Sequence, residues 1–446
     1  LEVYGNTETE VTGIELDSRK CSAGAAFVAI RGTQADGHAY IPKAISLGAN
    51  CIICETLPEA MEENVVYVVY ENTADIVGPL ATTFYGNPTK KMKLVGVTGT
   101  NGKTTTKELV RQVLSVKHNV TATEGNLNNS IGVPLTLLKI NPSTEIAVVE
   151  MGASHPGDIK ELVDIALPNF GLITNVGKAH LLGFGSFEGV KATKGELYDY
   201  LRRTSDKVFL NVDNPHLCQM ASERNLQSDP ERPYSLVLPY GLSLMGAEVL
   251  PSDAEHPFLR IRLQDRIVNT NLVGSYNADN VMAAIAVGQH FGVSLDDAVA
   301  AVEAYVPSNN RSQMTRTEKN TLIVDAYNAN PTSMEAALNN FASVVAERKV
   351  AMLGDMLELG EESVAEHVQV VRKALVSGID HVCLVGGEFA KAVDAVRAEG
   401  EACDSLLCFT TSQELADWLE ANPITDTAVL IKGSRGTRME KVITVL

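Results

Sequence analysis

The chain has 446 residues, of which 45% are hydrophobic and 21% are charged, and its formal net charge is −18. This composition is typical of a globular protein, and the length leads us to expect about three domains. The acidic balance argues against nucleic-acid binding, which needs a basic face, and no apolar run is long enough to span a membrane.

The start of the chain and its cysteines lead us to expect a cytoplasmic protein. The chain begins at Leu1 without a charged segment followed by an apolar one, so we expect no secretory signal. Seven cysteines are scattered without disulfide spacing, which favours a reducing, cytoplasmic location. Cys51 and Cys54 have the spacing of a redox or zinc pair, but their apolar surroundings favour a buried strand.

Two turn-rich segments, 85–91 and 306–310, divide the sequence. Clusters of Gly, Asn, Pro and Ser are typical of connections between folded units. We therefore expect three domains, at residues 1–90, 91–305 and 306–446.

Short apolar runs alternate with helical stretches in the second and third domains, and the first domain is expected to be a small α/β unit. The runs of the second domain cover residues 94–97, 146–149, 172–176 and 208–210. Those of the third domain cover residues 322–324, 350–353, 382–385 and 429–431. Such runs are typical of buried parallel strands, so we predict an α/β protein with two doubly wound sheets.

The segment Gly99-Thr100-Asn101-Gly102-Lys103-Thr104-Thr105 follows the first of these runs and precedes helical spacing over 106–116. Its glycines let the backbone approach an anion, Lys103 adds positive charge, and the Thr104 hydroxyl can hold Mg²⁺. The spacing differs from the common P-loop, because Gly96 lies six residues before Gly102 instead of five. The alternative is a turn that uses glycine only for its backbone freedom. The Lys-Thr-Thr sequence favours a site for a nucleoside triphosphate.

Polar residues follow two further strands, and ligands of open α/β sheets bind beyond the carboxyl ends of strands. Glu150 follows the run 146–149, and His180 follows the run 172–176. With Thr104, these residues could converge on one divalent cation, although imidazole is a less usual ligand for Mg²⁺. The alternative for His180 is a histidine satisfied by a hydrogen bond at the strand end.

Four motifs resemble the Mur ligases of peptidoglycan synthesis. They are VTGTNGKTT at 97–105, EMGA at 150–153, TNVGKAH at 174–180 and GSYNADN at 274–280. The resemblance covers the whole chain. It implies an N-terminal UDP-binding domain, a central P-loop ATPase domain and a C-terminal Rossmann-like domain. It also implies ATP-driven amide formation through an acyl phosphate, with ADP and phosphate as products.

Further motifs distinguish branches of this family. GNLNNSIGVP at 125–134, DAYNANP at 325–331, LGDMLELG at 353–360 and KGSRG at 432–436 resemble the branch that joins D-alanyl-D-alanine to UDP-N-acetylmuramoyl-tripeptide. The first hundred residues resemble the sister branch that adds lysine or diaminopimelate to the dipeptide. The alternatives are therefore the sister ligase or a hybrid, active or inactive, that is joined in the P-loop.

One observation favours the dipeptide. The sister branch recognises its amino acid with an Asp-Asn-Pro-Arg motif, whereas Asp213-Asn214-Pro215 is followed here by His216 and lies in the middle domain. A third hypothesis is a nucleotide-binding protein without catalytic activity. Lys103, Glu150, His180 and Lys194 argue against it.

The resemblance implies roles around ATP and two Mg²⁺ ions. The expected catalytic residues are Lys103, Glu150, His180 and Lys194. The expected nucleotide contacts are Gly99, Thr100, Asn101, Gly102, Lys103, Thr104, Thr105, Asn277, Asn280, Arg311 and Asp325. The expected metal ligands are Thr104, Glu150, His180 and Lys194, the last as a carbamate.

Periodicity alone leaves alternatives for three of these positions. Lys191 and Lys194 are both candidates for an ordinary helix lysine paired with a carboxylate. Ser275 or Asn277 could cap the following helix. Arg311 could be a surface residue of a linker.

The resemblance also implies contacts with the two substrates. Ser18 and Arg19 resemble contacts to the uridine diphosphate, and Asn128 and Asn129 resemble contacts to the muramoyl peptide. For the dipeptide, the candidates are Asn328, Asn330, Ser434 and Arg435. The alternatives are a solvated loop at 18–19 and left-handed turn residues at 128–129. Because the sites lie in three domains, we expect domain closure, and we expect a monomer.

Overall fold

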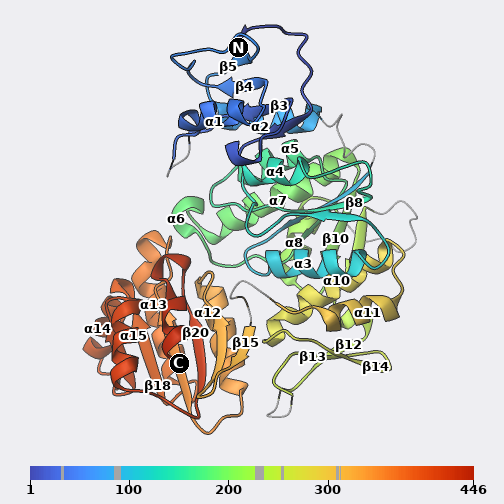
Figure 1. The fold of residues 1–446 in the computed structure, drawn as a ribbon. Coiled ribbons are helices and arrows are strands. Elements are labelled where there is room, and N and C mark those ends of the chain that lie inside the picture. Colours follow the sequence, from blue (N-terminus) through green and yellow to red (C-terminus); the bar gives the residue numbers. More distant parts are fainter. Residues whose placement is uncertain (32–34, 85–91, 227–235, 253–255, 308–310, 312) are drawn as a thin grey trace.

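The computed structural model describes residues 1–446 except 32–34, 85–91, 227–235, 253–255, 308–310 and 312. Three α/β units follow one another along the molecule, and the predicted fold class is confirmed (Figure 1). The expected boundary at 85–91 and most of the one at 306–310 lie outside the described residues.

The N-terminal unit is a five-stranded sheet in the order β1-β5-β4-β3-β2. Its strands are β1 (Glu2–Tyr4), β2 (Gly13–Glu15), β3 (Ala25–Val28), β4 (Cys51–Cys54) and β5 (Val66–Val69), with helices α1 (Ile41–Ser46) and α2 (Thr73–Phe84). β1 is antiparallel to β5, and the other neighbouring strands of this sheet are parallel. All four residues of β4 are buried, and burial raises the pKa of both its thiols to about 11. The buried-strand interpretation of Cys51 and Cys54 is therefore confirmed.

The central unit is a parallel six-stranded sheet in the order β11-β10-β9-β6-β8-β7. Its strands are β6 (Lys93–Thr98), β7 (Val120–Ala122), β8 (Ile146–Glu150), β9 (Phe170–Ile173), β10 (Lys207–Asn211) and β11 (Val237–Tyr240). The predicted strands are confirmed except at 174–176, because β9 ends at Ile173 and the next residues form a loop.

Helices cover both faces of this sheet, as the doubly wound prediction requires. One face packs on α3 (Lys103–Leu114), α10 (Ala278–His290) and α11 (Leu295–Ala304). The other face packs on α4 (Gly132–Leu137), α5 (Asp158–Ala166), α7 (Phe187–Thr204) and α8 (Pro215–Glu223). Alternation along β6 explains this, since Val95 and Val97 join the first core and Leu94 joins the second.

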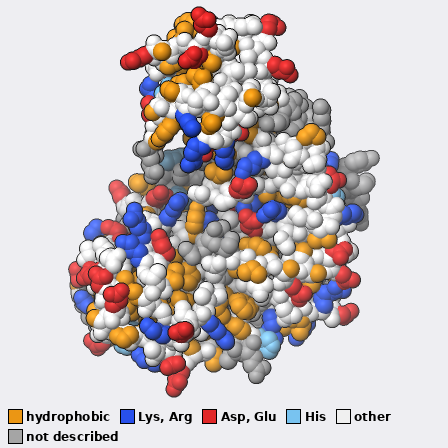
Figure 2. Space-filling model, viewed as in Figure 1, with side chains coloured by type: hydrophobic (Ala, Val, Ile, Leu, Met, Phe, Trp, Pro, Cys, Tyr) orange, Lys and Arg blue, Asp and Glu red, His pale blue; other side chains and the backbone are white. Residues whose placement is uncertain are grey.

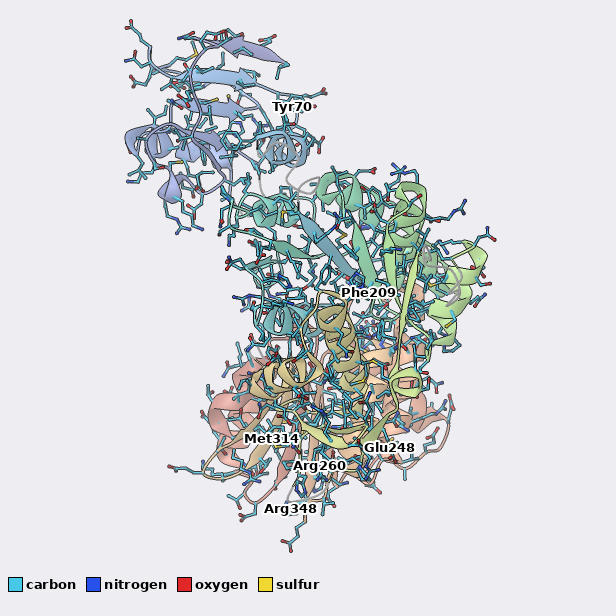
Figure 3. The ribbon with its side chains drawn as sticks, turned by 90° about the vertical axis from the view of Figure 1, so that its right-hand side faces the viewer. Tyr70, Phe209, Glu248, Arg260, Met314 and Arg348 are labelled. Atoms are coloured by element: carbon cyan, nitrogen blue, oxygen red, sulfur yellow. The ribbon has the colours of Figure 1, made fainter. Side chains whose placement is uncertain are left out.

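A three-stranded antiparallel sheet, which the sequence did not predict, follows the central sheet. It contains β12 (Ala247–Leu250), β13 (Arg260–Leu263) and β14 (Arg266–Asn269), preceded by α9 (Leu242–Met245). Figure 3 shows its residues Glu248 and Arg260 at the same end of the molecule as Met314 and Arg348 of the C-terminal unit.

The C-terminal unit is a six-stranded sheet in the order β15-β16-β20-β17-β18-β19. Its strands are β15 (Gln313–Arg316), β16 (Thr321–Asp325), β17 (Lys349–Gly354), β18 (His381–Val385), β19 (Leu406–Phe409) and β20 (Ala428–Lys432). Its helices are α12 (Pro331–Ser343), α13 (Ser363–Leu375), α14 (Gly387–Ala398) and α15 (Ser412–Ala421). Only β15 is antiparallel, and the predicted strands are confirmed. None of the helices in the described part of the chain has the length and hydropathy needed to cross a bilayer.

Candidate active site

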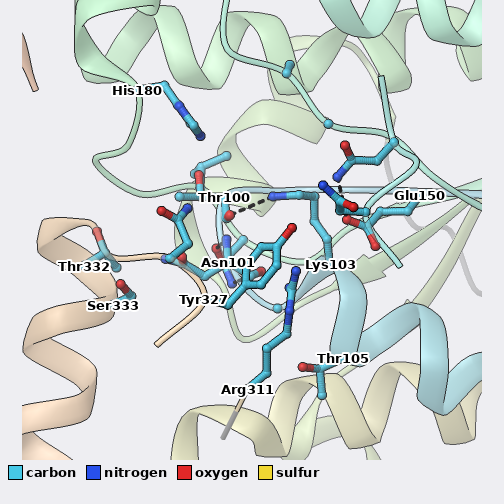
Figure 4. Close-up of a pocket in the computed structure, with 18 of the residues that line it drawn as sticks. Thr100, Asn101, Lys103, Thr105, Glu150, His180, Arg311, Tyr327, Thr332 and Ser333 are labelled. Atoms are coloured by element: carbon cyan, nitrogen blue, oxygen red, sulfur yellow. Dashed lines mark hydrogen bonds between the residues drawn. The ribbon is translucent and has the colours of Figure 1, made fainter. Parts of the chain in front are cut away.

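A cavity of about 710 Å³ lies between the central and C-terminal sheets. The central sheet contributes residues beyond the carboxyl ends of β6, β8 and β9, and the C-terminal sheet contributes the ends of β16 and β20. Figure 4 shows these side chains converging from the two units. Parallel strands place their carboxyl ends on one edge, which is why residues distant in sequence meet here.

The loop after β6 needs its glycines. Gly99 and Gly102 have φ values of +142° and +78°, which other residues rarely adopt. A Cβ atom would lie 2.0 Å from the Thr174 hydroxyl at Gly99 and 2.6 Å from the Asn280 amide oxygen at Gly102. The helix α3 begins directly afterwards, at Lys103, so its free N–H groups and the loop amides form a cradle for an anion.

The Lys103 amine folds back over this loop. Its Nζ donates to the carbonyl oxygens of Gly99 and Thr100, each at 2.8 Å, and Figure 4 shows the bond to Thr100. Burial lowers the Lys103 pKa to about 8, with a smaller contribution from Arg311, while Glu150 acts in the opposite direction. A phosphate oxygen would be a better acceptor for this amine than a neutral carbonyl.

Glu150 and Thr104 form the hard-oxygen pair that the sequence predicted. Glu150 is 1% exposed, and its carboxylate accepts from the Thr104 hydroxyl and from the Asn128 amide, both at 2.8 Å. Within the described residues, no group of three or more His, Cys, Asp and Glu side chains forms a metal cage. A carboxylate and a hydroxyl fit Mg²⁺, which takes its other ligands from water and substrate phosphates.

His180 lines the same cavity and is hydrogen-bonded, so the alternative of a satisfied histidine is confirmed, while its role as a metal ligand stays a prediction. Its Nδ1 pairs with the Glu358 carboxylate, which comes from the C-terminal unit. Burial lowers the His180 pKa, although Glu358 opposes this. Glu358 was missed as a site residue, although it lies within the motif at 353–360.

The two lysines of α7 differ in their surroundings. Lys191 donates to Glu188 at 2.9 Å, as an ordinary helix lysine does. Lys194 is 2% exposed, donates to the Ala153 carbonyl at 3.3 Å and lies 5.3 Å from the centre of the Phe184 ring. Burial, helped by the charge of Lys103, holds the Lys194 pKa well below its usual value. The paired-lysine alternative is therefore correct for Lys191 and wrong for Lys194.

Asn277 and Asn280 line the cavity, and Asn280 packs against Gly102. The Asn280 amide donates to the Asn277 side chain at 2.9 Å, and its oxygen accepts from Thr106 at 2.9 Å. Asn277 stands at the start of α10, but its side chain donates to the Val273 carbonyl instead of capping the helix. Ser275 lies in the 3₁₀ turn before the helix, so the capping alternative is wrong for both residues.

The C-terminal unit contributes two pairs. The Arg311 guanidinium lies 3.7 Å from the centre of the Tyr327 ring, and both residues line the cavity, so the surface-linker alternative for Arg311 is wrong. Asp325 accepts from Lys432 at 2.5 Å, and Lys432 is 1% exposed. Tyr327 and Lys432 were missed, although each belongs to a motif that was recognised.

The expected substrate residues lie in three places: on the cavity wall, elsewhere in the C-terminal unit, and in the N-terminal unit. Asn128, Asn129 and Asn328 line the cavity, and neither Asn128 nor Asn129 has a positive φ, so the left-handed-turn alternative is wrong. The Asn129 side chain accepts from the Gly132 amide at 2.9 Å.

Three expected dipeptide contacts lie off the cavity wall. Asn330 is 3% exposed and caps α12, and its side chain pairs with Asn101. Ser434 is also 3% exposed and accepts from the Leu357 amide at 3.1 Å. Arg435 is exposed at the surface. The structure does not bring these three residues into the cavity, because each is held by its own local contacts or faces solvent.

Ser18 and Arg19 lie in the N-terminal unit, away from the cavity. Ser18 is buried, and Arg19 is exposed and tied to Asp17 by two side-chain hydrogen bonds. Figure 2 shows Lys and Arg side chains gathered where this unit meets the central one. The pKa of Glu124 is lowered there by its hydrogen bond with Lys139 and by the charges of Lys139, Lys20 and Arg111.

A glycine-rich anion cradle that faces a second, mostly parallel sheet defines a nucleotide-binding α/β protein whose site is built by two domains. Residues 97–288 match the Mur ligase middle domain, residues 310–435 the Mur ligase glutamate ligase domain, and residues 10–85 the catalytic domain of the Mur ligase family. The chain belongs to the Mur ligase family.

Individual relatives match almost the whole chain. The UDP-N-acetylmuramoyl-tripeptide–D-alanyl-D-alanine ligase of Bacillus subtilis is 30% identical over 442 residues, covering 98% of this chain and 93% of the relative. A MurF crystal structure from Acinetobacter baumannii superposes with a TM-score of 0.83 at 27% identity, covering 98% and 93%. The MurF ligase of Thermotoga maritima in complex with ADP gives a TM-score of 0.80 at 26% identity, covering 98% and 97%.

Proposed function

We propose that the chain is an ATP-dependent ligase that joins D-alanyl-D-alanine to UDP-N-acetylmuramoyl-tripeptide. The observation that carries this proposal is the end-to-end similarity to ligases of that name, on both sides of residue 100. It does not favour the sister ligase that adds lysine or diaminopimelate. A hybrid origin of the first hundred residues stays a prediction.

The chemistry of the site supports this reaction. A carboxylate is a poor electrophile because its charge repels nucleophiles and oxide is a poor leaving group. Transfer of the γ-phosphoryl group of ATP to a carboxylate oxygen gives an acyl phosphate and ADP. The amine of the dipeptide then attacks the carbonyl carbon, phosphate leaves, and an amide bond forms. Lys103 and the loop amides would bind the phosphates through these steps.

The donor atoms in the cavity fit Mg²⁺. Thr104 and Glu150 would hold one ion, which would offset negative charge on the transferred phosphoryl group. For a second ion we propose His180 and a carbamylated Lys194. Carbamylation needs a neutral amine, and the depressed pKa of Lys194 supports it.

Contacts across the cavity support a role for domain closure. Lys178 of the central unit pairs with Glu366 of the C-terminal unit at 2.5 Å, and its amide donates to the Thr332 hydroxyl at 3.1 Å. A closed cavity would keep water away from the acyl phosphate. Because one chain supplies both walls, we propose that it acts as a monomer.

The UDP end of the substrate would lie where the N-terminal and central units meet. Lys20, Arg111 and Lys139 gather there around Glu124, and cations at such a junction suit a diphosphate. Ser18 and Arg19 are adjacent to Lys20 and are proposed as contacts to the uridine diphosphate.

Phosphate release tests the function. The full chain is mixed with ATP, Mg²⁺ and each pairing of UDP-muramoyl dipeptide or tripeptide with D-alanyl-D-alanine, lysine or diaminopimelate. We expect release only with the tripeptide and D-alanyl-D-alanine. Release only with a single amino acid would establish the sister activity, and no release with any pair would indicate an inactive hybrid or a non-catalytic protein.

A further inference from the structure

The cavity holds three cationic side chains that are stabilised in different ways. Lys103 donates to two carbonyl groups of its own loop, and Lys432 donates to Asp325. Arg311 contacts no carboxylate among the residues that the structure describes, and its buried Nε has no hydrogen-bond partner there. Arg311 is therefore held by something other than an ion pair.

That contact is the face of Tyr327. The central carbon of the Arg311 guanidinium lies 3.7 Å from the ring centre, which is the geometry of a cation–π pair. Figure 4 shows the two side chains together beside Lys103 and Asn101.

Lys432 contacts residues on both sides of Tyr327. The buried Lys432 amine donates to the Asp325 carboxylate at 2.5 Å and to the Asn328 carbonyl at 3.3 Å. These bonds restrain the segment that carries Tyr327, so the position of its ring is restrained as well. Arg311 comes from the connection between α11 and β15 and packs on this ring.

An aromatic partner leaves the guanidinium able to bind an anion, whereas a carboxylate partner would not. A carboxylate would neutralise the guanidinium and occupy the N–H groups that phosphate oxygens use. A stacked ring holds the guanidinium plane and leaves the N–H groups at its edge free for an anion. Arg311 and Lys103 line the same cavity, so the guanidinium lies beside the phosphate loop (Figure 4).

We propose that Tyr327 is a positioning residue that keeps Arg311 oriented and unpaired for the phosphates of the bound nucleotide. The proposal rests on the proposed function only in taking an adenine nucleotide as the ligand. It makes Tyr327 a determinant of nucleotide affinity that acts through Arg311.

Calorimetric titration of the full chain with ADP and Mg²⁺ tests this. Tyr327→Leu removes the ring, and we expect about fivefold to tenfold weaker ADP binding. Tyr327→Phe keeps the ring and is expected to recover most of the affinity that Leu loses. Tyr4→Leu makes the same change on β1 of the N-terminal unit and is expected to bind ADP as the wild type does.

A double-mutant cycle shows whether Tyr327 acts through Arg311. Against Arg311→Ala, Tyr327→Leu is expected to cause no further loss of ADP affinity. The proposal is overturned if Tyr327→Leu binds ADP like the wild type, or if it weakens binding by the same factor with and without Arg311. Should Tyr327→Leu fail to fold, Tyr327→Gln takes its place in the cycle.

ADP can bind without any ligation reaction. The role of Tyr327 and the proposed ligase function can therefore be refuted independently of each other. A chain that shows the coupling but never joins D-alanyl-D-alanine would refute the proposed function alone. A chain that ligates the dipeptide without the coupling would refute the role of Tyr327 alone.

Discussion

Asn101 of the phosphate loop and Asn330 at the start of α12 exchange side-chain hydrogen bonds across the central and C-terminal units. The Asn330 amide donates to the Asn101 oxygen at 2.8 Å, and the Asn101 amide donates back at 3.3 Å. Asn330 also caps α12, since its oxygen accepts from the Ser333 amide at 2.9 Å. One side chain thus begins a helix in one unit and supports the phosphate loop in the other.

The double role of Asn330 predicts a graded effect of substitution. Asn330→Ala removes both the cap and the contact with Asn101, and we expect it to lower the free energy of unfolding by about 1–2 kcal/mol. Asn330→Ser can still cap α12 but is too short to reach Asn101, so most of the stability should return. Urea unfolding of the full chain measures both variants. Equal stability of Asn330→Ala and the wild type would contradict this interpretation.

Glu150 is the carboxylate on which the proposed metal site depends. Glu150→Gln keeps the size of the side chain but removes its charge, and we expect phosphate release to fall about 100-fold or more, with a higher Mg²⁺ requirement. Chelation of Mg²⁺ should abolish phosphate release, and added Mg²⁺ should restore it. Glu223→Gln, at the end of α8, is the matched control. A Glu150→Gln variant with the wild-type rate and Mg²⁺ dependence would remove Glu150 from the site.

The contrast between Lys194 and Lys191 predicts a dependence on carbon dioxide. If Lys194 is carbamylated, ligation should slow in buffers freed of CO₂ and recover when bicarbonate is added, because only the neutral amine reacts with CO₂. Lys194→Gln should be slow in both buffers. Lys191→Gln changes a lysine paired with Glu188 and should keep the bicarbonate response. The carbamate is refuted if the wild type is insensitive to CO₂ removal.

The buried parallel strands could be predicted because both their faces are covered and they form continuous apolar runs. The antiparallel sheet β12–β14 was missed, since its strands have only four residues and do not form continuous apolar runs. The alternation of Arg260 and Arg262 with buried Ile261 and Leu263 in β13 is the signal that could have found it. The early end of β9 was also missed, because Thr174 and Asn175 leave the strand and donate to the Asn101 carbonyl of the phosphate loop.

The candidate site could be predicted where a side chain directly follows its own strand or loop, as Glu150 and Lys103 do. Contacts between the central and C-terminal units could not be predicted from the sequence. Glu358 meets His180 across 178 positions of the sequence, and this contact depends on how two units pack together. For the same reason, the sequence could not show that Asn330 supports the phosphate loop instead of lining the cavity.

His367 predicts how stability depends on pH. Its ring is completely buried on α13, where Nε2 accepts from the Met356 amide at 3.0 Å and Nδ1 donates to the Ser363 carbonyl at 2.7 Å. The Nε2 bond requires the neutral ring, because both nitrogens of a protonated ring are donors and neither can accept. Burial lowers the His367 pKa, although the hydrogen bond to the Ser363 carbonyl and the charges of Asp355, Glu388 and Glu366 act in the opposite direction.

Because the folded pKa of His367 lies below the unfolded one, the unfolded chain binds more protons between the two values. The stabilisation is therefore complete above the unfolded pKa of about 6.5 and is lost as the pH falls through the folded pKa. His367→Leu leaves the Met356 amide and Ser363 carbonyl without these partners, so at pH 7.5 it should cost about 2–3 kcal/mol. Urea unfolding at several pH values should show the gap between wild type and variant narrowing below pH 6. A gap that is constant or widens on acidification would mean that the buried ring is protonated in the folded protein.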